Sequence, residues 1–307
     1  MKILVAGASG FVGTALCREL KERGHRVFAA DKAGAEYAFD LSCRNSIKQL
    51  LESTLPDAIV LLAGISNVSF GWTHPTETFA INVTGALGFF ECHLQIVPKA
   101  RFIFAGSAEE YGKSSPDGVP FKEDDICCPA NPYALSKYSV AQAMKMLAAK
   151  DGRSFVHLRL ANHYGPGQRK GFVTADFASQ VAEKIIKNDR EKIRVGNLQA
   201  QKDFVYLDDV IEAYVKIIEA EKLNYDTYNI GAGLPIAVRD ILETLLKNSS
   251  GTAQIVTDPQ KFRSADTVKL SLDITRISSE LNWQPRTPLD EGMKKTLAYW
   301  IEKIQHS

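Results

Sequence analysis

Short apolar runs alternate with helical patterns through the first half of the chain, and this alternation restricts the possible folds more than any other feature. Five β-rich runs predict buried strands at residues 3–6, 26–30, 58–62, 101–105 and 155–160. The stretches between them predict helices at residues 11–23, 46–53, 76–95 and 132–150. Such alternation gives a parallel sheet with right-handed crossovers and helices on both faces. We therefore predict an α/β fold with a doubly wound parallel sheet, which binds its ligands at the carboxyl ends of the strands.

A glycine-rich turn, G-A-S-G-F-V-G, follows the first predicted strand and opens the first predicted helix. Gly7 permits a tight turn, Gly10 lets the backbone approach a ligand, and Gly13 allows close packing of helix and strand. The N-terminus of such a helix faces the pyrophosphate of a dinucleotide. The sequence therefore predicts a nicotinamide dinucleotide site rather than an empty strand–helix turn.

An acidic residue, Asp31, ends the second predicted strand, where it can accept hydrogen bonds from the adenosine ribose and repel a 2′-phosphate. It favours NAD over NADP, although Lys32 beside it keeps NADP open. Asp40 could meet the adenine, and an ordinary loop aspartate is the alternative. The cofactor-binding residues predicted along the first strands are Gly7, Gly10, Phe11, Val12, Gly13, Asp31, Asp40, Leu41, Leu62, Ala63 and Gly64.

The second half carries helical patterns separated by turn-rich segments. These helices are predicted at residues 174–187, 208–220, 238–246, 274–281 and 289–304. We interpret residues 1–161 as a dinucleotide-binding domain, with residues 203–231 interleaved into it. Residues 162–307 are interpreted mainly as a smaller substrate-binding region.

A tyrosine and a lysine four residues apart, Tyr133 and Lys137, share one face of a predicted helix. Asn131 suits the N-cap and Pro132 the first helical position, so negative charge on the Tyr133 oxygen is favoured there. The Lys137 ammonium is expected to lower the pKa of the Tyr133 phenol further. Although this spacing alone also occurs in exposed pairs, the addition of Ser107 at a strand end predicts oxidoreductase chemistry at a carbonyl or carbinol carbon.

The composition excludes several other kinds of partner. The 307 residues carry a net charge of +1 with no long block of one sign, which disfavours nucleic-acid binding through a broad basic face. The five cysteines are odd in number and include no C-x-x-C pair, which indicates reduced thiols and a cytoplasmic protein. We expect no membrane association, because no signal peptide precedes the first strand and the apolar runs are short. Without His or Cys at ligand spacing, we predict no metal.

The motifs together resemble those of the extended short-chain dehydrogenase/reductase family, the nucleotide-sugar epimerases, dehydratases and reductases with a Rossmann fold. The resemblance runs through G-A-S-G-F-V-G, N-V-T-G from Asn82, G-S-A-E-E-Y-G from Gly106, Y-A-L-S-K from Tyr133, K-D-F from Lys202 and D-D-V from Asp208. It implies that Ser107, Tyr133 and Lys137 are the catalytic residues. It also implies that Asn82 helps to position them, and that Asn82, Tyr133 and Lys137 belong to the cofactor site.

Within this family, the chain is most similar to the GDP-4-keto-6-deoxy-D-mannose reductases. The similarity lies in N-H-Y-G-P-G-Q from Asn162, G-F-V-T-A-D-F-A from Gly171, and V-G-N-L-Q-A-Q-K-D-F from Val195. The chain departs from that subfamily at Ala161, at Lys202 and in the segment from Arg263 to Val268. These departures concern the base and the sugar more than the reaction type.

The expected substrate is a nucleotide-diphosphate sugar. Arg263 offers a fork of donors for phosphate, and Asp266 can accept from ribose hydroxyls; a local surface salt bridge is the alternative for this pair. The resemblance adds Asn162 and Lys202 at the sugar or diphosphate. The predicted substrate-binding residues are Ser107, Glu109, Asn162, Lys202, Arg263 and Asp266.

Three functions remain open. The first is an NAD(P)H-dependent reductase of a nucleotide-linked 4-keto-6-deoxy sugar. The second is an epimerase or 4,6-dehydratase; the Ala108-Glu109 pair in place of Asp-Glu argues against the glucose-type dehydratases. The third is a non-catalytic NAD(P)-sensing protein, which the Tyr133–Lys137 pair argues against. The family resemblance further implies a homodimer, in which residues 76–95 and 132–150 form a four-helix bundle with their copies.

Overall fold

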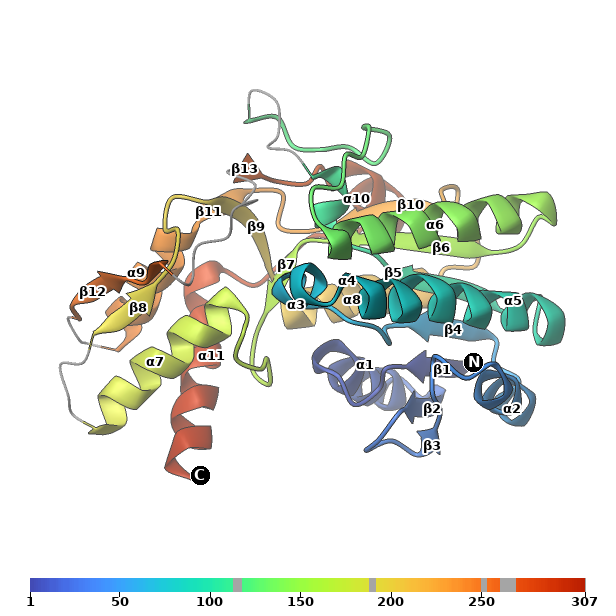
Figure 1. Cartoon of the computed structure of the whole chain (residues 1–307), viewed down its shortest axis with the longest axis horizontal. Helices are drawn as coiled ribbons and strands as arrows, with labels where there is room; N and C mark the ends of the chain where they lie inside the picture. Colours follow the sequence, from blue (N-terminus) through green and yellow to red (C-terminus); the bar gives the residue numbers. More distant parts are fainter. Residues whose placement is uncertain (113–117, 188–191, 250–252, 260–268, 307) are drawn as a thin grey trace.

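The core of the protein is a seven-stranded sheet, in which every neighbouring pair of strands is parallel (Figure 1). The computed structural model describes residues 1–112, 118–187, 192–249, 253–259 and 269–306. The strand order is β10-β6-β5-β4-β1-β2-β3. These strands are β1 (Lys2–Ala6), β2 (Arg26–Asp31), β3 (Tyr37–Ala38), β4 (Ala58–Leu61), β5 (Arg101–Ala105), β6 (Phe155–Leu160) and β10 (Thr227–Ile230). The predicted doubly wound parallel sheet is confirmed, and its strand order reverses between β1 and β4, where such sheets bind ligands.

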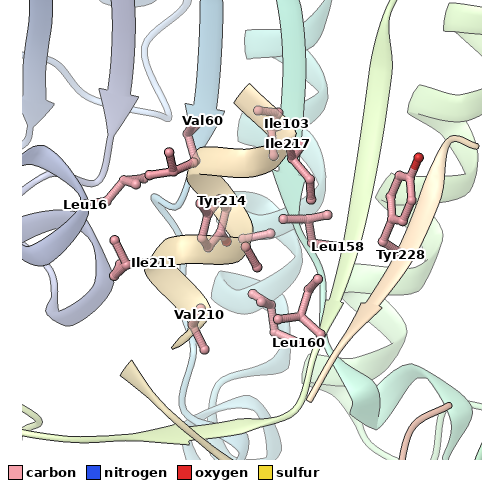
Figure 2. Close-up of a cluster of buried hydrophobic side chains, with 14 of the residues drawn as sticks. Leu16, Val60, Ile103, Leu158, Leu160, Val210, Ile211, Tyr214, Ile217 and Tyr228 are labelled. Carbon is pink, nitrogen blue, oxygen red and sulfur yellow. The ribbon is translucent and has the colours of Figure 1, made fainter. Parts of the chain in front are cut away.

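Helices cover both faces of this sheet. On one face lie α1 (Phe11–Glu22) and α8 (Leu207–Glu219); on the other lie α2 (Arg44–Thr54), α5 (Ala86–Ile96) and α6 (Pro132–Lys150). Figure 2 shows Val210, Ile211, Tyr214 and Ile217 of α8 packed over the sheet residues of the first face. Because side chains alternate across a strand and both faces are covered, β1 and β4 are nearly continuous apolar runs.

The predicted helix at residues 76–95 is wrong as a single regular helix. The chain forms α3 (Val68–Thr73) and then α4 (Pro75–Phe79), where Pro75 takes the first helical position. A π-helical turn, Ala80–Gly85, joins α4 to α5. Such wide turns are frequent at functional sites, and this one carries Asn82.

The second part of the chain contains short strands in the segments that the sequence indicated only as turn-rich. A small sheet has the order β11 (Pro235–Ala237), β9 (Gln201–Tyr206) and β13 (Lys269–Leu270), and β7 (Asn162–Tyr164) also pairs with β9. A two-stranded sheet joins β8 (Ile193–Val195) and β12 (Ile255–Thr257). Most of these strands have two or three residues, which is too short for a periodic pattern to identify.

Three helices pack together beside these small sheets: α7 (Val173–Lys187), α9 (Val238–Asn248) and α11 (Leu289–Gln305). Figure 1 shows them grouped at one end of the molecule, away from the large sheet. The chain leaves the large sheet after β6 and returns to it with α8 and β10, and α10 (Thr275–Leu281) then packs against β10. The division of the chain at residue 161 stays a prediction. Within the described ranges, none of the helices combines the length and apolar character that a membrane crossing requires.

Candidate active site

The glycine turn has the geometry that close approach of a ligand requires. Gly7 has a φ of +100°, and a Cβ on it would lie 2.6 Å from the Ala63 backbone N. A Cβ on Gly13 would lie 2.1 Å from the Gly7 carbonyl oxygen, because α1 packs directly on the turn. Gly10 takes the N-cap position of α1 without any side-chain cap, so the N-cap side chain leaves the first N–H groups of the helix available to a ligand. These features fit a pyrophosphate at the N-terminus of α1.

A cleft of about 1130 Å³ runs from this turn, at the carboxyl ends of the strands, into the second part of the chain. Its lining includes all the predicted cofactor-binding residues except Asn82, and it extends from Asp31 to Tyr133. The predicted residues in the lining are Gly7, Gly10, Phe11, Val12, Gly13, Asp31, Asp40, Leu41, Leu62, Ala63, Gly64, Tyr133 and Lys137. Ser107, Glu109, Asn162 and Lys202 line the same cleft.

Asp31 is the last residue of β2 and lines the cleft. Its Oδ2 accepts a hydrogen bond from the Ser9 N–H at 2.9 Å and its Oδ1 accepts one from the Lys32 N–H at 2.7 Å. A carboxylate has further lone pairs, so Asp31 can still accept from ribose hydroxyls. Lys32 Nζ lies 3.4 Å from Asp40 Oδ2, and hydrogen bonds from Ser42 lower the pKa of the Asp40 carboxyl.

The N-terminus of α6 is capped as the sequence predicts. Asn131 has an extended backbone, and its Oδ1 accepts a hydrogen bond from the Ala134 N–H at 2.8 Å. Pro132 follows at the first helical position, and Tyr133 and Lys137 then lie one turn apart with both side chains buried. Lys137 Nζ donates to the Ala105 carbonyl at the end of β5 at 2.9 Å, which ties the helix to the sheet.

The expected lowering of the Tyr133 pKa is wrong for the protein alone. Burial raises the pKa of the Tyr133 phenol, a hydrogen bond with Ser107 opposes this, and the charges of Glu110 and Glu109 raise it further. Burial also lowers the pKa of Lys137 to about 8, against the opposing effect of Glu110. The reason is that only 8% of Tyr133 and 5% of Lys137 is exposed, so desolvation is the largest influence on the pKa of each group.

Ser107 lies at the carboxyl end of β5 and caps a single 3₁₀ turn, Ala108–Tyr111. Its Oγ accepts from the Glu109 N–H at 3.2 Å, and its own N–H donates to Glu110 Oε1 at 2.8 Å. The structure thus brings together the three predicted catalytic residues, Ser107, Tyr133 and Lys137, in one wall of the cleft.

An ion pair joins two predicted substrate-binding residues. Lys202 Nζ on β9 donates to Glu109 Oε1 at 3.0 Å, and Asn131 Nδ2 donates to Glu109 Oε2 at 3.3 Å. The pair links the large sheet with the smaller one, beside Ser107. Asn162 is exposed in the same cleft, and its Nδ2 donates to the Asp203 carbonyl at 3.5 Å. Arg263 and Asp266 lie outside the described residues.

Among the described residues, Asn82 is not part of the cleft lining, but its hydrogen bonds hold segments that are. Its Oδ1 accepts from the Ile65 N–H at 2.8 Å, and its Nδ2 donates to the Ile65 carbonyl at 2.9 Å and to Ser136 Oγ at 3.1 Å. It thereby connects the π-helical turn to the segment after β4 and to α6. Its predicted contact with the cofactor stays a prediction, as do the ligand roles of the other site residues.

Sequence reasoning gave no site role to several residues that line the cleft. These are Trp72, Asn131, Arg169, Phe172 and Asn197. Arg169 directly follows the N-H-Y-G-P-G-Q motif, so a cation was visible there in the sequence. Trp72 gave no such signal, because its helix, α3, was not predicted. Within the described ranges, no three His, Cys, Asp or Glu side chains gather at a position that could hold a metal ion.

Comparison with known proteins identifies the family. The model of the NAD dependent epimerase/dehydratase family matches residues 3–231. This chain belongs to that family. The predicted family, the NAD(P) cofactor and the assignment as an enzyme are therefore confirmed.

The relatives within the epimerase/dehydratase family include both reductases and epimerases. The GDP-6-deoxy-D-mannose reductase of Pseudomonas aeruginosa is 27% identical over 304 residues, which cover 99% of this chain and 98% of that protein. The UDP-glucose 4-epimerase of Mycolicibacterium smegmatis is 29% identical over 324 residues, which cover 99% and 100%.

Solved structures of the family give the same two groups. RMD from Pseudomonas aeruginosa, complexed with NADPH, matches with a TM-score of 0.89 and 26% identity over 99% of this chain and 100% of that one. The UDP-glucose 4-epimerase of Thermotoga maritima, with UDP-glucose, matches with a TM-score of 0.90 and 26% identity over the same shares.

Proposed function

We propose that this protein is an NAD(P)H-dependent reductase of a nucleotide-linked 4-keto-6-deoxy sugar. The observation that carries the proposal is the placement of Ser107, Tyr133 and Lys137 in one wall of a cleft that begins at the glycine turn. The N-H-Y-G-P-G-Q and G-F-V-T-A-D-F-A segments, and the likeness to a GDP-6-deoxy-D-mannose reductase, support a reductase of this kind.

The bound reduced nicotinamide would supply the hydride for C4 of the sugar. The residues of this chain would supply the proton and would position the sugar and the cofactor. Tyr133 is held as a neutral phenol by its burial, which suits a group that gives its proton to the C4 oxygen. The Ser107 hydroxyl would hydrogen-bond the same oxygen. Lys137 would bind the nicotinamide ribose hydroxyls and then support the phenolate that remains on Tyr133.

An epimerase is the second candidate, because UDP-glucose 4-epimerases match this chain as completely as the reductase does. A 4,6-dehydratase would need a free acid and base beside Ser107. In this protein Ala108 occupies one of the two positions, and Glu109 is bonded to Lys202 and Asn131. That arrangement favours the reductase over a dehydratase.

The deciding experiment combines purified protein with GDP-, dTDP- and UDP-linked 4-keto-6-deoxy sugars and measures NAD(P)H oxidation. A reductase consumes the reduced cofactor in a one-to-one ratio with the keto sugar. An epimerase instead retains oxidised cofactor and interconverts UDP-glucose and UDP-galactose without net consumption. Binding of NAD(P)H without turnover of any of these sugars would support the sensing protein.

The remaining proposals concern the setting of the enzyme. We infer a homodimer formed by α5 and α6, where Leu135 and Met146 of α6 are 44% and 74% exposed.

We also propose that the enzyme prefers NAD to NADP, because Asp31 lies at the end of β2. The cytoplasmic location rests on the five free cysteines.

A further inference from the structure

A buried carboxylate that the proposed reaction does not use lies beside Ser107. Glu110 is fully buried, and its Oε1 accepts a hydrogen bond from the Ser107 N–H at 2.8 Å. Because Ser107 Oγ caps the same 3₁₀ turn, the two residues form a reciprocal capping box. Glu110 therefore fixes the backbone that carries the Ser107 hydroxyl.

Two side chains of β6 surround this carboxylate. His157 Nε2 lies 3.1 Å from Glu110 Oε1, and Arg159 Nε lies 3.5 Å from Glu110 Oε2. A Cβ on Gly106 would lie 2.2 Å from His157 Nε2 and 2.5 Å from Glu110 Oε1, so the space is closely filled. Apolar residues can often replace a buried ion pair without loss of stability, so a contribution to stability alone does not account for this cluster.

The carboxylate and the Lys137 ammonium hold the same short segment after β5. Lys137 Nζ donates to the Ala105 carbonyl at 2.9 Å, and Glu110 accepts from the N–H of Ser107, two residues later. Burial alone would raise the pKa of Glu110, but His157, Arg159 and the Ser107 N–H outweigh it, and the pKa lies below its ordinary value. The carboxylate is therefore charged at neutral pH, and its charge opposes the lowering of the Lys137 pKa by burial.

Other charged and titratable groups face the same residues. Glu109 comes from the 3₁₀ turn and is paired with Lys202 from β9. Tyr214 comes from α8 and lies near Tyr133. Of these groups, Glu110 alone is both fully buried and bonded to the Ser107 backbone.

We propose that Glu110 is a positioning residue of the active site, which holds the Ser107 backbone in place and puts a buried negative charge on the segment that Lys137 also binds. The proposal rests on the proposed function, since it takes Ser107, Tyr133 and Lys137 as the reacting groups. It assigns Glu110 no contact with substrate or cofactor.

The test is Glu110→Gln, which keeps an acceptor oxygen for the Ser107 N–H and removes the charge. The Lys137 pKa is measured by ¹³C NMR in the cofactor-free protein with labelled lysine side chains, assigned through Lys137→Arg. We expect the pKa to fall by on the order of half a unit or more, as the loss of a nearby opposite charge requires. An unchanged Lys137 pKa in Glu110→Gln would overturn the proposal.

Glu123→Gln is the matched control. Glu123 is another buried glutamate of the same region, whose Oε1 accepts from the Asn229 N–H at 2.9 Å and which lies 3.7 Å from Arg276. Its replacement removes a buried charge without touching Ser107, so the Lys137 pKa should stay at the wild-type value. An equal fall in both variants would make the effect a general loss of packing and would contradict the proposal.

Two further measurements complete the design. If Glu110→Gln does not fold, the Glu110 carboxyl of the wild-type protein is titrated instead through its ¹³C signal. The carboxyl should remain ionised down to the ordinary glutamate pKa of about 4.3. A carboxyl that is protonated above that pH would overturn the proposal. With a keto-sugar substrate, the alkaline limb of kcat in Glu110→Gln should move to lower pH by the shift seen for Lys137. A wild-type protein that reduces no keto sugar would refute the proposed function and leave the NMR result standing.

Discussion

The Lys202 ammonium lies 3.0 Å from a carboxylate oxygen of Glu109, across the cleft from the large sheet to the small one. Both side chains are mostly buried, with 12% and 21% of their areas exposed. Glu109 also accepts from Asn131, so its two oxygens are both bonded in the protein alone. The Lys202 ammonium has further donors, so an anionic substrate group that bound Lys202 would share the cation with Glu109. We propose that the pair links substrate binding to the surroundings of Ser107.

Replacement of Lys202 by Gln should weaken binding of the nucleotide sugar more than it slows the chemical step. A hydrogen bond to a charged group contributes about 1.5–3 kcal/mol, so KM should rise roughly 10- to 100-fold while kcat changes less. Steady-state kinetics with varied sugar concentration measures both. Lys170→Gln is the control, because the Lys170–Glu183 pair, at 2.8 Å, lies outside the cleft lining. Equal KM values in the wild type and Lys202→Gln would refute this role.

Asp31 should set the preference for NADH over NADPH. We propose that the Asp31 charge faces the 2′-position of the adenosine ribose, so Asp31→Ser should relax or reverse the preference. The ratio of kcat/KM for the two cofactors measures it. A wild-type enzyme that already favours NADPH tenfold, about 1.4 kcal/mol, would show that this interpretation of Asp31 is wrong. Asp57→Ser, which replaces a carboxylate at the opposite ends of the strands, should leave the ratio unchanged.

The parts that could be predicted from sequence are those with a local cause. The strands β5 and β6 begin and end at the predicted residues, because strands covered on both faces are mostly apolar and bounded by turns; His157 and Arg159 are the polar exceptions in β6. The start of α6 follows from Asn131 and Pro132, whose cap and fixed φ act within one turn.

The parts that could not be predicted depend on contacts between distant segments. The Glu109–Lys202 pair joins residues 93 positions apart, and the short strand that carries Lys202 has no pattern of its own. The direction of the Tyr133 pKa was wrong for a similar reason. Helix position and Lys137 are visible in the sequence, but the burial that raises the Tyr133 pKa results from packing between distant segments.

The proposed dimer can be broken at α6. Met146 is 74% exposed on this helix, and a charge in its place would be buried without a partner in a four-helix bundle. Met146→Glu should therefore shift the protein from dimer to monomer in light scattering at micromolar concentration. Ile126→Glu, at an 85% exposed loop position, is the control and should remain dimeric. A monomeric wild-type protein would contradict the dimer itself.

A buried histidine should make the protein sensitive to acid. His93 is fully buried among Phe90 and Phe102, and neither ring nitrogen has a hydrogen-bond partner among the described residues. Burial lowers the pKa of His93 to about 4 from 6.5. Between these values the unfolded chain binds a proton that the folded protein does not, so stability falls as pH falls through 6.5 toward 4.

His93→Leu should remove this loss. Because of His93, the free energy of unfolding of the wild type should be about 2 kcal/mol lower at pH 5 than at neutral pH, at roughly 1.36 kcal/mol per pH unit below 6.5. The variant should not show this decrease. Urea unfolding at pH 7.5 and pH 5 gives the comparison. His306→Leu, at an exposed position, should behave as the wild type. The same acid loss in His93→Leu and the wild type would show that other groups cause it.

Removal of the Tyr133 hydroxyl should lower the turnover rate strongly. Tyr133→Phe removes the hydroxyl and leaves the buried ring, so the fold and cofactor binding should survive. Turnover should fall by on the order of 10²–10⁴, the usual contribution of a positioned general acid.

Ser107→Ala should lower kcat with less effect on cofactor binding. Tyr225→Phe, at a 47% exposed position, is the control and should change neither kcat nor cofactor binding. Because burial raises the Tyr133 pKa and lowers that of Lys137 to about 8, the alkaline limb of kcat should report their coupled ionisation. Near-normal reduction of a keto sugar by Tyr133→Phe, with cofactor still bound, would mean that the proton comes from another group.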